Sequence, residues 1–326
     1  MRRASTARAI AVRVSACAAR SQWDNPRRMF PRTSRRQWIT SLAGLLASPL
    51  ALGARVEDVG DGLRALEGRA GGRLGACLLD TGTQRVVGHR LDERFAMCST
   101  FKLLLAAVVL READAGRLSL DEKLPYGKAD LIPTSPVTSQ HVAEGAMSLR
   151  ALIQAAQETS DNTAANLVMA RLGGPARFTA LLRAAGDETT RLDRLEPIMN
   201  LVPPGDPRDT TSPRAMATSV ARFVVGDALR TSAREQLAGW MVATKTGGRR
   251  VRAGLPPEWR AGDKTGTLVG GGAITDKYND VAVAWPPGRP PLVVAAYYDT
   301  GSATQAMSDA PEAVLADVGR LTARWS

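Results

Sequence analysis

A serine and a lysine three residues apart stand near the start of an otherwise apolar run that ends at Leu110. In the segment MCSTFKL, one helical turn separates Ser99 from Lys102, so in a helix the hydroxyl and the ammonium lie within reach of each other. A serine hydroxyl becomes a good nucleophile only when a base removes its proton. Burial lowers the pKa of a lysine ammonium, which makes Lys102 a candidate for that base. The pair alone also fits a lysine that reaches the surface of an ordinary helix, so partners are needed elsewhere.

Three further segments carry hydroxyl, amide, carboxylate and ammonium groups that could complete such a site. They are Ser160 and Asn162 in TSDNTAAN, Glu196 and Asn200 in RLDRLEPIMN, and Lys264, Thr265, Gly266 and Thr267 in DKTGT. Taken singly, each has a simpler explanation: a helix N-cap, a loop acid and a lysine on an edge strand. Their joint presence in one chain, in this order, favours the functional interpretation.

In this order and with these spacings, the four segments resemble the motif set of class A β-lactamases, which are serine enzymes. The segments SPVTSQH, SDNTAANL, GDPRDTTSP and RAGLPPEW extend the resemblance from Val56 to the C-terminus. It implies hydrolysis of the β-lactam ring of penicillins and cephalosporins through a serine acyl-enzyme intermediate, which confers resistance to these antibiotics. We expect a monomer with no cofactor, whose partner is a small-molecule β-lactam substrate.

The resemblance implies roles for four catalytic residues. Ser99 attacks the β-lactam carbonyl, and Ser160 passes a proton to the departing lactam nitrogen, since a hydroxyl can both donate and accept. Either Lys102, or Glu196 through a water, starts acylation, and both remain open at this stage. Glu196 is also expected to be the general base for the water that hydrolyses the acyl-enzyme. Asn200, four residues on, would orient that water.

The resemblance also implies how substrate is held. Backbone N–H groups of Ser99 and Thr267 would form an oxyanion hole, and Gly266 would let the strand approach the ligand closely. Asn162 would hold the acylamino side chain of the substrate. The expected substrate-binding residues are Asn162, Asn200, Arg250, Lys264, Thr265, Gly266 and Thr267.

Arg250 departs from the commonest family pattern. Many members carry an arginine on the strand after K-T-G, but the corresponding segment DKYNDVAV has none, whereas Arg250, in RRVRAGLP, stands where some members keep a substitute. A guanidinium can pair two carboxylate oxygens in a fork, so we expect Arg250 to anchor the substrate carboxylate. The alternative is a solvated arginine in a cluster of three. Thr134 stands where an aromatic commonly lines the cleft, which leaves the preferred β-lactam open, carbapenems included.

The segment from Gly186 to Ser212 is long and rich in proline, and a loop of this length in a compact domain usually carries function. By resemblance, a salt bridge between Arg194 and Asp209 pins its ends, and the Glu196–Pro197 peptide bond is cis.

Two other functions share part of this motif set. A penicillin-binding DD-peptidase has S-x-x-K, S-x-N and K-T-G but would stay acylated by β-lactams, and Glu196 argues against it. A sensor that signals through an acylated serine would need a transmembrane segment, whereas the sequence holds no apolar run of about 18 residues.

Histidines and cysteines predict little chemistry. His89 and His141 lack zinc-ligand spacing, so we expect no metal. Cys77 and Cys98 lie in apolar surroundings and are expected to be free, buried thiols.

The basic character of the chain belongs to its first residues. Residues 1–54 contain ten arginines and one acid, Asp24, so nine of the eleven net positive charges lie there. The nearly neutral remainder offers no footprint for nucleic acid. Arg35 and Arg36 precede a short apolar stretch and small residues, which resembles a twin-arginine export signal; a Sec signal is the alternative. We therefore expect a cleaved leader and a periplasmic or secreted enzyme without a membrane anchor in its mature form.

Hydrophobic periodicity places the candidate residues on a mixed fold. Helical patterns cover 55–69 and much of 100–244, and strand patterns cover 73–81 and 84–90. Three more strands read WRAGDKTGTLV, NDVAVAWP and PLVVAAYYD, before a final helix over 307–325.

We therefore predict an α/β fold with a sheet built from both ends of the chain and helices inserted between. The resemblance makes this a five-stranded antiparallel sheet with flanking helices plus an inserted all-α lobe. The predicted boundaries are a leader at 1–54, an α/β lobe at 55–92 and 245–326, and an all-α lobe at 93–244.

Overall fold

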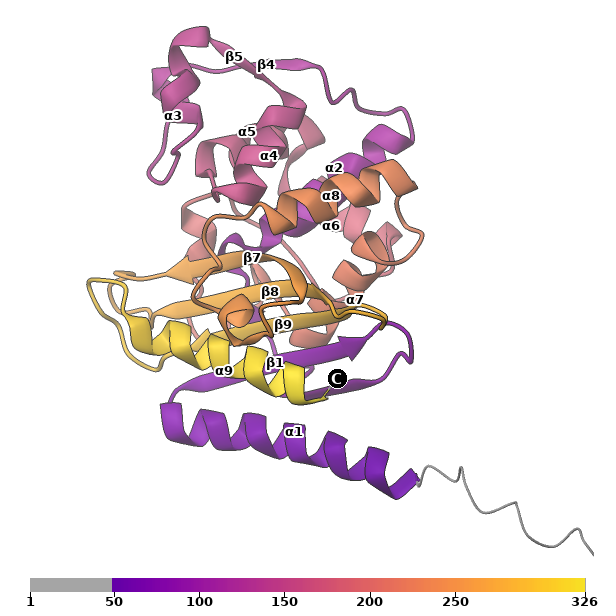
Figure 1. Cartoon of the computed structure of the whole chain (residues 1–326). Coiled ribbons are helices and arrows are strands. Elements are labelled where there is room, and N and C mark those ends of the chain that lie inside the picture. The colour runs from indigo at the N-terminus through magenta and orange to yellow at the C-terminus, as the bar shows by residue number, and fades with distance from the viewer. Residues whose placement is uncertain (1–48, 326) are drawn as a thin grey trace, which may run out of the picture. The chain divides into compact units, whose positions relative to one another are not determined.

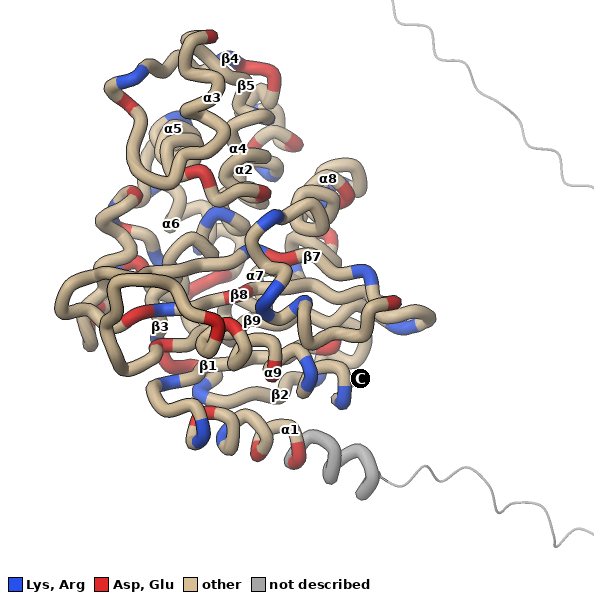
Figure 2. The backbone as a smooth tube through the Cα atoms, turned by 60° about the vertical axis from the view of Figure 1, so that its left-hand side comes forward, with Lys and Arg blue, Asp and Glu red and all other residues tan. Residues whose placement is uncertain are grey.

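The computed structural model describes residues 49–325, with side chains from residue 58 onward. The expected export signal, with Arg35 and Arg36, lies outside the described residues. Within them, no helix combines the length and the apolar character that crossing a bilayer requires. Acidic and basic residues are interspersed along the described backbone (Figure 2).

The predicted five-stranded antiparallel sheet is confirmed (Figure 1). Its strands run in the spatial order β2 (Val86–His89), β1 (Arg73–Asp80), β9 (Leu292–Asp299), β8 (Lys277–Trp285) and β7 (Arg260–Leu268). Every neighbouring pair is antiparallel. The strand that carries K-T-G, β7, is therefore at the edge of the sheet.

Both faces of the sheet are covered. Alternate side chains of β1 divide between two hydrophobic clusters, with Cys77 and Leu79 on one face and Leu78 on the other. The helices α1 (Pro49–Ala70) and α9 (Asp309–Trp325) pack together over the second face (Figure 1). Coverage of both faces explains why the strands are continuous apolar runs rather than alternating ones.

The first face joins the sheet to the helical lobe through one continuous cluster. At its centre lies α2 (Phe101–Asp114), in which every residue from Phe101 to Leu110 is buried. The other long helices of this side are α4 (Leu149–Glu158), α5 (Asn162–Leu172), α6 (Gly174–Ala184), α7 (Pro213–Val224) and α8 (Thr231–Val242). The predicted helices over 100–244 are therefore present. The predicted lobe boundaries stay a prediction, since α7 also packs against β1 and β9.

Short elements connect these units. They are β3 (Phe95–Ala96), η1 (Cys98–Thr100), β4 (Lys123–Pro125), η2 (Lys128–Asp130), α3 (Thr138–His141), η3 (Val142–Glu144), β5 (Ala146–Ser148), η4 (Ile198–Asn200), β6 (Thr210–Thr211) and η5 (Val251–Gly254). Cys77 and Cys98 are free and buried, as expected.

Candidate active site

Ser99 and Lys102 are in contact, as the helical spacing predicts. Ser99 lies in the single turn η1, and Lys102 lies in the first turn of α2. Lys102 Nζ donates to Ser99 Oγ at 3.0 Å. Cys98, directly before the serine, has a φ of +45°, a left-handed conformation that a non-glycine residue adopts only where the surroundings impose it.

Lys102 is fully buried among more acceptors than its three protons can serve at once. Besides Ser99, its Nζ contacts Ser160 O at 2.9 Å, Asn162 Oδ1 at 2.5 Å and Glu196 Oε1 at 3.0 Å. Burial lowers the pKa of the Lys102 ammonium, and the neighbouring Glu196 carboxylate opposes that shift. A lysine in this position can hold a proton or receive one from Ser99.

Glu196 contacts both Ser99 and Lys102, so the three side chains contact one another. Ser99 Oγ donates to Glu196 Oε1 at 3.3 Å, and Asn200 Nδ2 donates to Glu196 Oε2 at 2.6 Å. The sequence interpretation missed Asn166, which exchanges two hydrogen bonds with the Glu196 backbone, at 3.1 Å to its N–H and 2.9 Å to its carbonyl. Asn166 stands in the quoted segment TSDNTAAN, one helical turn after Asn162. That spacing, on the same face of α5, was the available signal.

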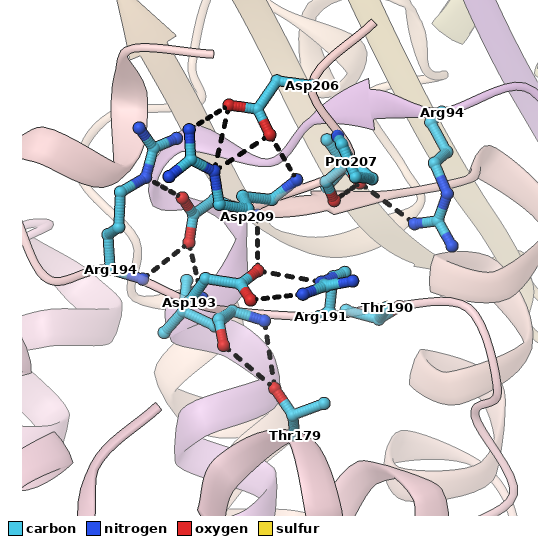
Figure 3. Close-up of polar contacts among 12 residues, drawn as sticks. Arg94, Thr179, Thr190, Arg191, Asp193, Arg194, Asp206, Pro207 and Asp209 are labelled. Carbon is cyan, nitrogen blue, oxygen red and sulfur yellow. Dashed lines mark hydrogen bonds and ion pairs between the residues drawn. The ribbon is translucent and has the colours of Figure 1, made fainter. Parts of the chain in front are cut away.

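The loop that carries Glu196 is pinned at its ends, as predicted. Arg194 Nε donates to Asp209 Oδ2 at 2.5 Å, and the backbone N–H groups of Asp193 and Arg194 donate to Asp209 Oδ1 (Figure 3). Asp193 in turn pairs with Arg191 in the same view. Asp209 has no exposed surface, and the Glu196–Pro197 peptide bond is cis.

Ser160 lies between two lysines. Lys264 Nζ donates to Ser160 Oγ at 3.0 Å, and Lys102 Nζ approaches the same oxygen at 3.4 Å. Burial lowers the pKa of Lys264 well below its usual range, and the charge of Lys102 adds to the effect. Asp161, the middle residue of S-D-N, is turned away into the protein, where it accepts hydrogen bonds from the N–H and hydroxyl of Thr138.

Gly266 has a close neighbour within the protein, a contact that the sequence interpretation did not include. A Cβ on Gly266 would lie 2.7 Å from the carbonyl oxygen of Met97, so the missing side chain lets β7 approach the backbone around η1. The expected close approach of the ligand at this glycine stays a prediction. The close neighbour in the structure is the protein itself, and this contact sets the spacing between Ser99 and Thr267.

Arg250 is buried, with 2 % of its surface exposed, and is not the solvated arginine of the alternative interpretation. Its Nη1 donates to the carbonyls of Gly266 and Asn279, its Nη2 to Thr267 Oγ1 at 2.8 Å, and its Nε to Glu312 Oε1 at 3.1 Å. Four of its five N–H groups are thus occupied. The sequence predicted that two N–H groups of Arg250 would be free to pair with a substrate carboxylate. That prediction is wrong, because hydrogen bonds within the described part of the chain leave only one N–H group without an acceptor.

A cleft of about 620 Å³ unites the predicted residues. Ser99, Ser160, Asn162, Glu196, Asn200, Arg250, Thr265 and Thr267 all line it. Lys102 and Lys264 are not lining residues but contact the hydroxyl of Ser160, which is one, and Gly266 lies between Thr265 and Thr267 on β7. Thr134, Ile198 and Met307 also border the cleft, and the last two are exposed apolar side chains.

Comparison with known proteins decides the family. Residues 59–325 match the family model described as the Beta-lactamase enzyme family. The chain belongs to this family. It is 46 % identical over 259 residues to the β-lactamase CTX-M-8 of Citrobacter amalonaticus, an alignment that covers 79 % of this chain and 87 % of the relative. The β-lactamase AST-1 of Nocardia asteroides is 50 % identical over 230 residues, covering 71 % of this chain and 72 % of the relative.

Solved structures place the chain in class A. An ancestral (GNCA) class A β-lactamase superposes with a TM-score of 0.76 at 54 % identity, covering 81 % of this chain and 98 % of the other. A β-lactamase from Xanthomonas campestris gives the same TM-score at 43 % identity, over 82 % of this chain and 97 % of the other. The resemblance seen in the motifs is confirmed, and the protein is a class A β-lactamase.

Proposed function

We propose that Ser99 attacks the carbonyl of penicillins and cephalosporins and carries the acyl group until water releases it. The observation that carries the proposal is the contact of Ser99 Oγ with both Lys102 and Glu196 at the wall of the cleft. A hydroxyl flanked by an amine and a carboxylate has two groups able to take its proton. The protein hydrolyses the β-lactam ring and so confers resistance to these antibiotics.

Two residues are placed to start acylation. Lys102 Nζ lies 3.0 Å from Ser99 Oγ, and its lowered pKa increases the fraction of neutral amine that can accept a proton. Glu196 Oε1 lies 3.3 Å from the same oxygen. Lys102 is the base that we favour, because its contact is the shorter one and leaves Glu196 free for the second step.

Ring opening requires a proton at the departing nitrogen. The Ser160 hydroxyl faces the cleft and contacts Lys264 at 3.0 Å and Lys102 at 3.4 Å. Since Lys102 receives the Ser99 proton, Ser160 can pass a proton from Lys102 to the nitrogen. Lys264 orients the Ser160 hydroxyl throughout.

Substrate is held along β7 and by the helical lobe. Backbone N–H groups of Ser99 and Thr267 would stabilise the oxyanion of the tetrahedral intermediate. Lys264, Thr265 and Thr267 would bind the substrate carboxylate, with Arg250 acting through Thr267 Oγ1 and through its charge. Asn162 would hold the acylamino side chain, as the resemblance implies.

Glu196 and Asn200 would deprotonate and orient the deacylating water. Asn200 Nδ2 fixes Glu196 Oε2 at 2.6 Å, and Asn200 Oδ1 accepts no hydrogen bond from any described residue. That oxygen can accept a hydrogen bond from one O–H of the water while Glu196 removes the other proton.

The test is the Glu196→Ala variant mixed with benzylpenicillin. It is expected to acylate at Ser99 through Lys102 but to release product at least ~100 times more slowly, since general-base assistance contributes about 10²- to 10⁴-fold. Intact-mass spectrometry would then show a persistent adduct on the variant and none on the wild type at steady state. Glu188→Ala, an exposed acid in the same loop, is the matched control and should turn over normally.

Three results would contradict the assignment. A wild type that stays acylated for hours would be a penicillin-binding protein or sensor. Full turnover by Glu196→Ala would move the deacylating base elsewhere. A variant that no longer acylates would make Glu196, rather than Lys102, the acylation base.

We further propose that the enzyme acts as a monomer and is exported by the twin-arginine route. The support for the export route is the leader sequence with Arg35 and Arg36. Replacing both arginines by lysine should abolish periplasmic activity, and unchanged export would favour the Sec route. Size-exclusion chromatography with light scattering tests the oligomeric state.

A further inference from the structure

Two buried aspartates lie on adjacent strands behind the K-T-G motif. Asp263 is on β7, two residues before Thr265, and Thr265 is the direct partner of Asp280 on β8. Residues two apart on a strand project from the same face, so the two aspartates are diagonal neighbours on one face of the sheet. Neither side chain has any exposed surface.

Each carboxyl group is hydrogen-bonded through one oxygen. Arg252 Nε donates to Asp263 Oδ2 at 2.7 Å, and the Val251 backbone N–H donates to Asp280 Oδ2 at 3.0 Å. The other two oxygens, Asp263 Oδ1 and Asp280 Oδ1, are buried and accept no hydrogen bond from a donor in residues 58–325. A buried polar atom without a partner is costly, so two of them on diagonally neighbouring residues require an explanation.

The charges around the pair favour one negative charge over two. Positive charge comes from Arg250, directly before η5, from Arg252 within η5 and from Lys264 on β7. Glu312 of α9 already pairs with Arg250. Burial raises the pKa of Asp263 to about 6 despite Arg252. Burial, together with the charge of Asp263, raises the pKa of Asp280 well above its usual range. Neighbouring buried carboxyls in such a setting do not both ionise readily.

We propose that Asp263 and Asp280 share a single proton between their Oδ1 atoms at neutral pH. The O–H of one carboxyl donates to the other, so one proton satisfies both unpartnered oxygens. The pair then carries one negative charge, which Arg252 balances. No other bond forms or breaks.

The shared proton makes the pair a positioning element for the substrate-binding strand. Its outer oxygens hold Val251 and Arg252, the two residues after Arg250. Arg250 in turn donates to Gly266 O and to Thr267 Oγ1. The aspartates thus fix the η5 segment against β7 and β8, and through Arg250 they fix the end of β7 that borders the cleft.

The first test is proton NMR of the wild-type enzyme, which needs no variant. A proton held between two carboxyl oxygens is expected to give a resonance far downfield of the amide region, and it should disappear in Asp280→Asn. A wild-type spectrum without such a resonance at low temperature would count against the proposal.

The second test uses the pH dependence of stability, whose sign follows from proton counting. Unfolded aspartates lose their protons near pH 4, whereas the folded pair keeps one. Above about pH 4 the folded state therefore binds one proton more than the unfolded state, so the stability that depends on this pair falls as pH rises, until the upper pKa of the pair is passed. In Asp280→Asn the new amide donates to Asp263 Oδ1, and no proton is held.

The ratio of the wild-type to the Asp280→Asn unfolding equilibrium constant is expected to rise by about tenfold per pH unit over that window. Urea titrations from about pH 5 to pH 8 measure it. Asp121→Asn, which removes one charge at an exposed position, is the matched control and should show no such rise. Parallel wild-type and Asp280→Asn curves, or an equal slope in Asp121→Asn, would overturn the shared proton.

Discussion

Replacing Gly266 by alanine is expected to slow acylation while the fold persists. The added Cβ would lie 2.7 Å from Met97 O, 3.1 Å from Thr100 Cγ2 and 3.2 Å from Cys98 Cβ. Ordinary van der Waals contact begins at 3.4 Å, so β7 and η1 must separate by several tenths of an ångström. The nearest atom is a backbone oxygen, which cannot rotate away as a flexible side chain can.

The size of the effect follows from what the two segments carry. Ser99 belongs to η1 and Thr267 follows Gly266 on β7, so the separation moves apart the two proposed oxyanion donors. Loss of one such donor costs about 10²- to 10³-fold in kcat, and a misplacement of about 1 Å can cost about 10²-fold. A shift of several tenths of an ångström is therefore expected to slow acylation about 10- to 100-fold. Overpacking should lower the free energy of unfolding by about 1–3 kcal/mol.

Stopped-flow measurement of the nitrocefin acylation rate, with urea titration of the same samples, tests both numbers. Gly239→Ala on α8 is the control, because a Cβ there meets no atom within 4 Å. It should acylate at the wild-type rate and gain about 0.5–1 kcal/mol, as alanine in a helix interior does. A Gly266→Ala enzyme that is destabilised but acylates within threefold of the wild type would refute the link between the β7–η1 contact and the oxyanion donors.

Three further changes have defined outcomes. Arg250→Ala should raise KM for benzylpenicillin about 10- to 100-fold, because its charge beside the carboxylate site and its hydrogen bond to Thr267 Oγ1 are both lost, and an unchanged KM in steady-state assays would exclude a binding role. Arg194→Ala leaves the buried Asp209 carboxylate without its cation and should lower the free energy of unfolding by about 2–4 kcal/mol in urea titrations, whereas a stable variant would deny the salt bridge its structural role. The hydrogen bond from Arg90 lowers the pKa of Glu67 to about 2, so the stability it contributes is present above pH 4.5 and lost as pH falls toward 2. Glu67→Gln should therefore cost about 1–2 kcal/mol at pH 7, after allowance for solvent screening, and nothing below pH 2; a pH-independent difference would contradict this.

Local pattern predicted most of the elements that position the site. The apolar run after Cys98 predicted α2, and the turn signals around RLGACLLDT and QRVVGHR predicted the β1–β2 hairpin. Strand order and direction came from the resemblance, because pairing Arg73 with Asp299 depends on contacts far apart in sequence that periodicity does not encode.

Within the site, residue types were easier to predict than the reasons for them. Ser99 and Lys102 met as one helical turn requires. The sequence predicted Arg250 as a site residue, but it did not predict the hydrogen bonds that occupy its guanidinium group. Their acceptors include two backbone carbonyls and the carboxylate of Glu312, which is more than sixty positions away. The sequence likewise predicted Gly266 as a site residue, but it did not predict the contact between β7 and the backbone around η1 that leaves no room for a side chain there. Acceptors supplied by the backbone leave no trace in residue identity.

The placement of β9 between β1 and β8 bears on how the polypeptide is made. When β1 and β2 leave the ribosome they form only a two-stranded hairpin, which is marginally stable by itself in water. Their central partner, Leu292–Asp299, is the last of the five strands to be synthesised, and α9 follows it. The nascent chain therefore cannot complete its sheet until about 200 residues have followed β2. Until then the β1–β2 hairpin keeps an unpaired edge, so late pairing with β9 is the step that closes the sheet.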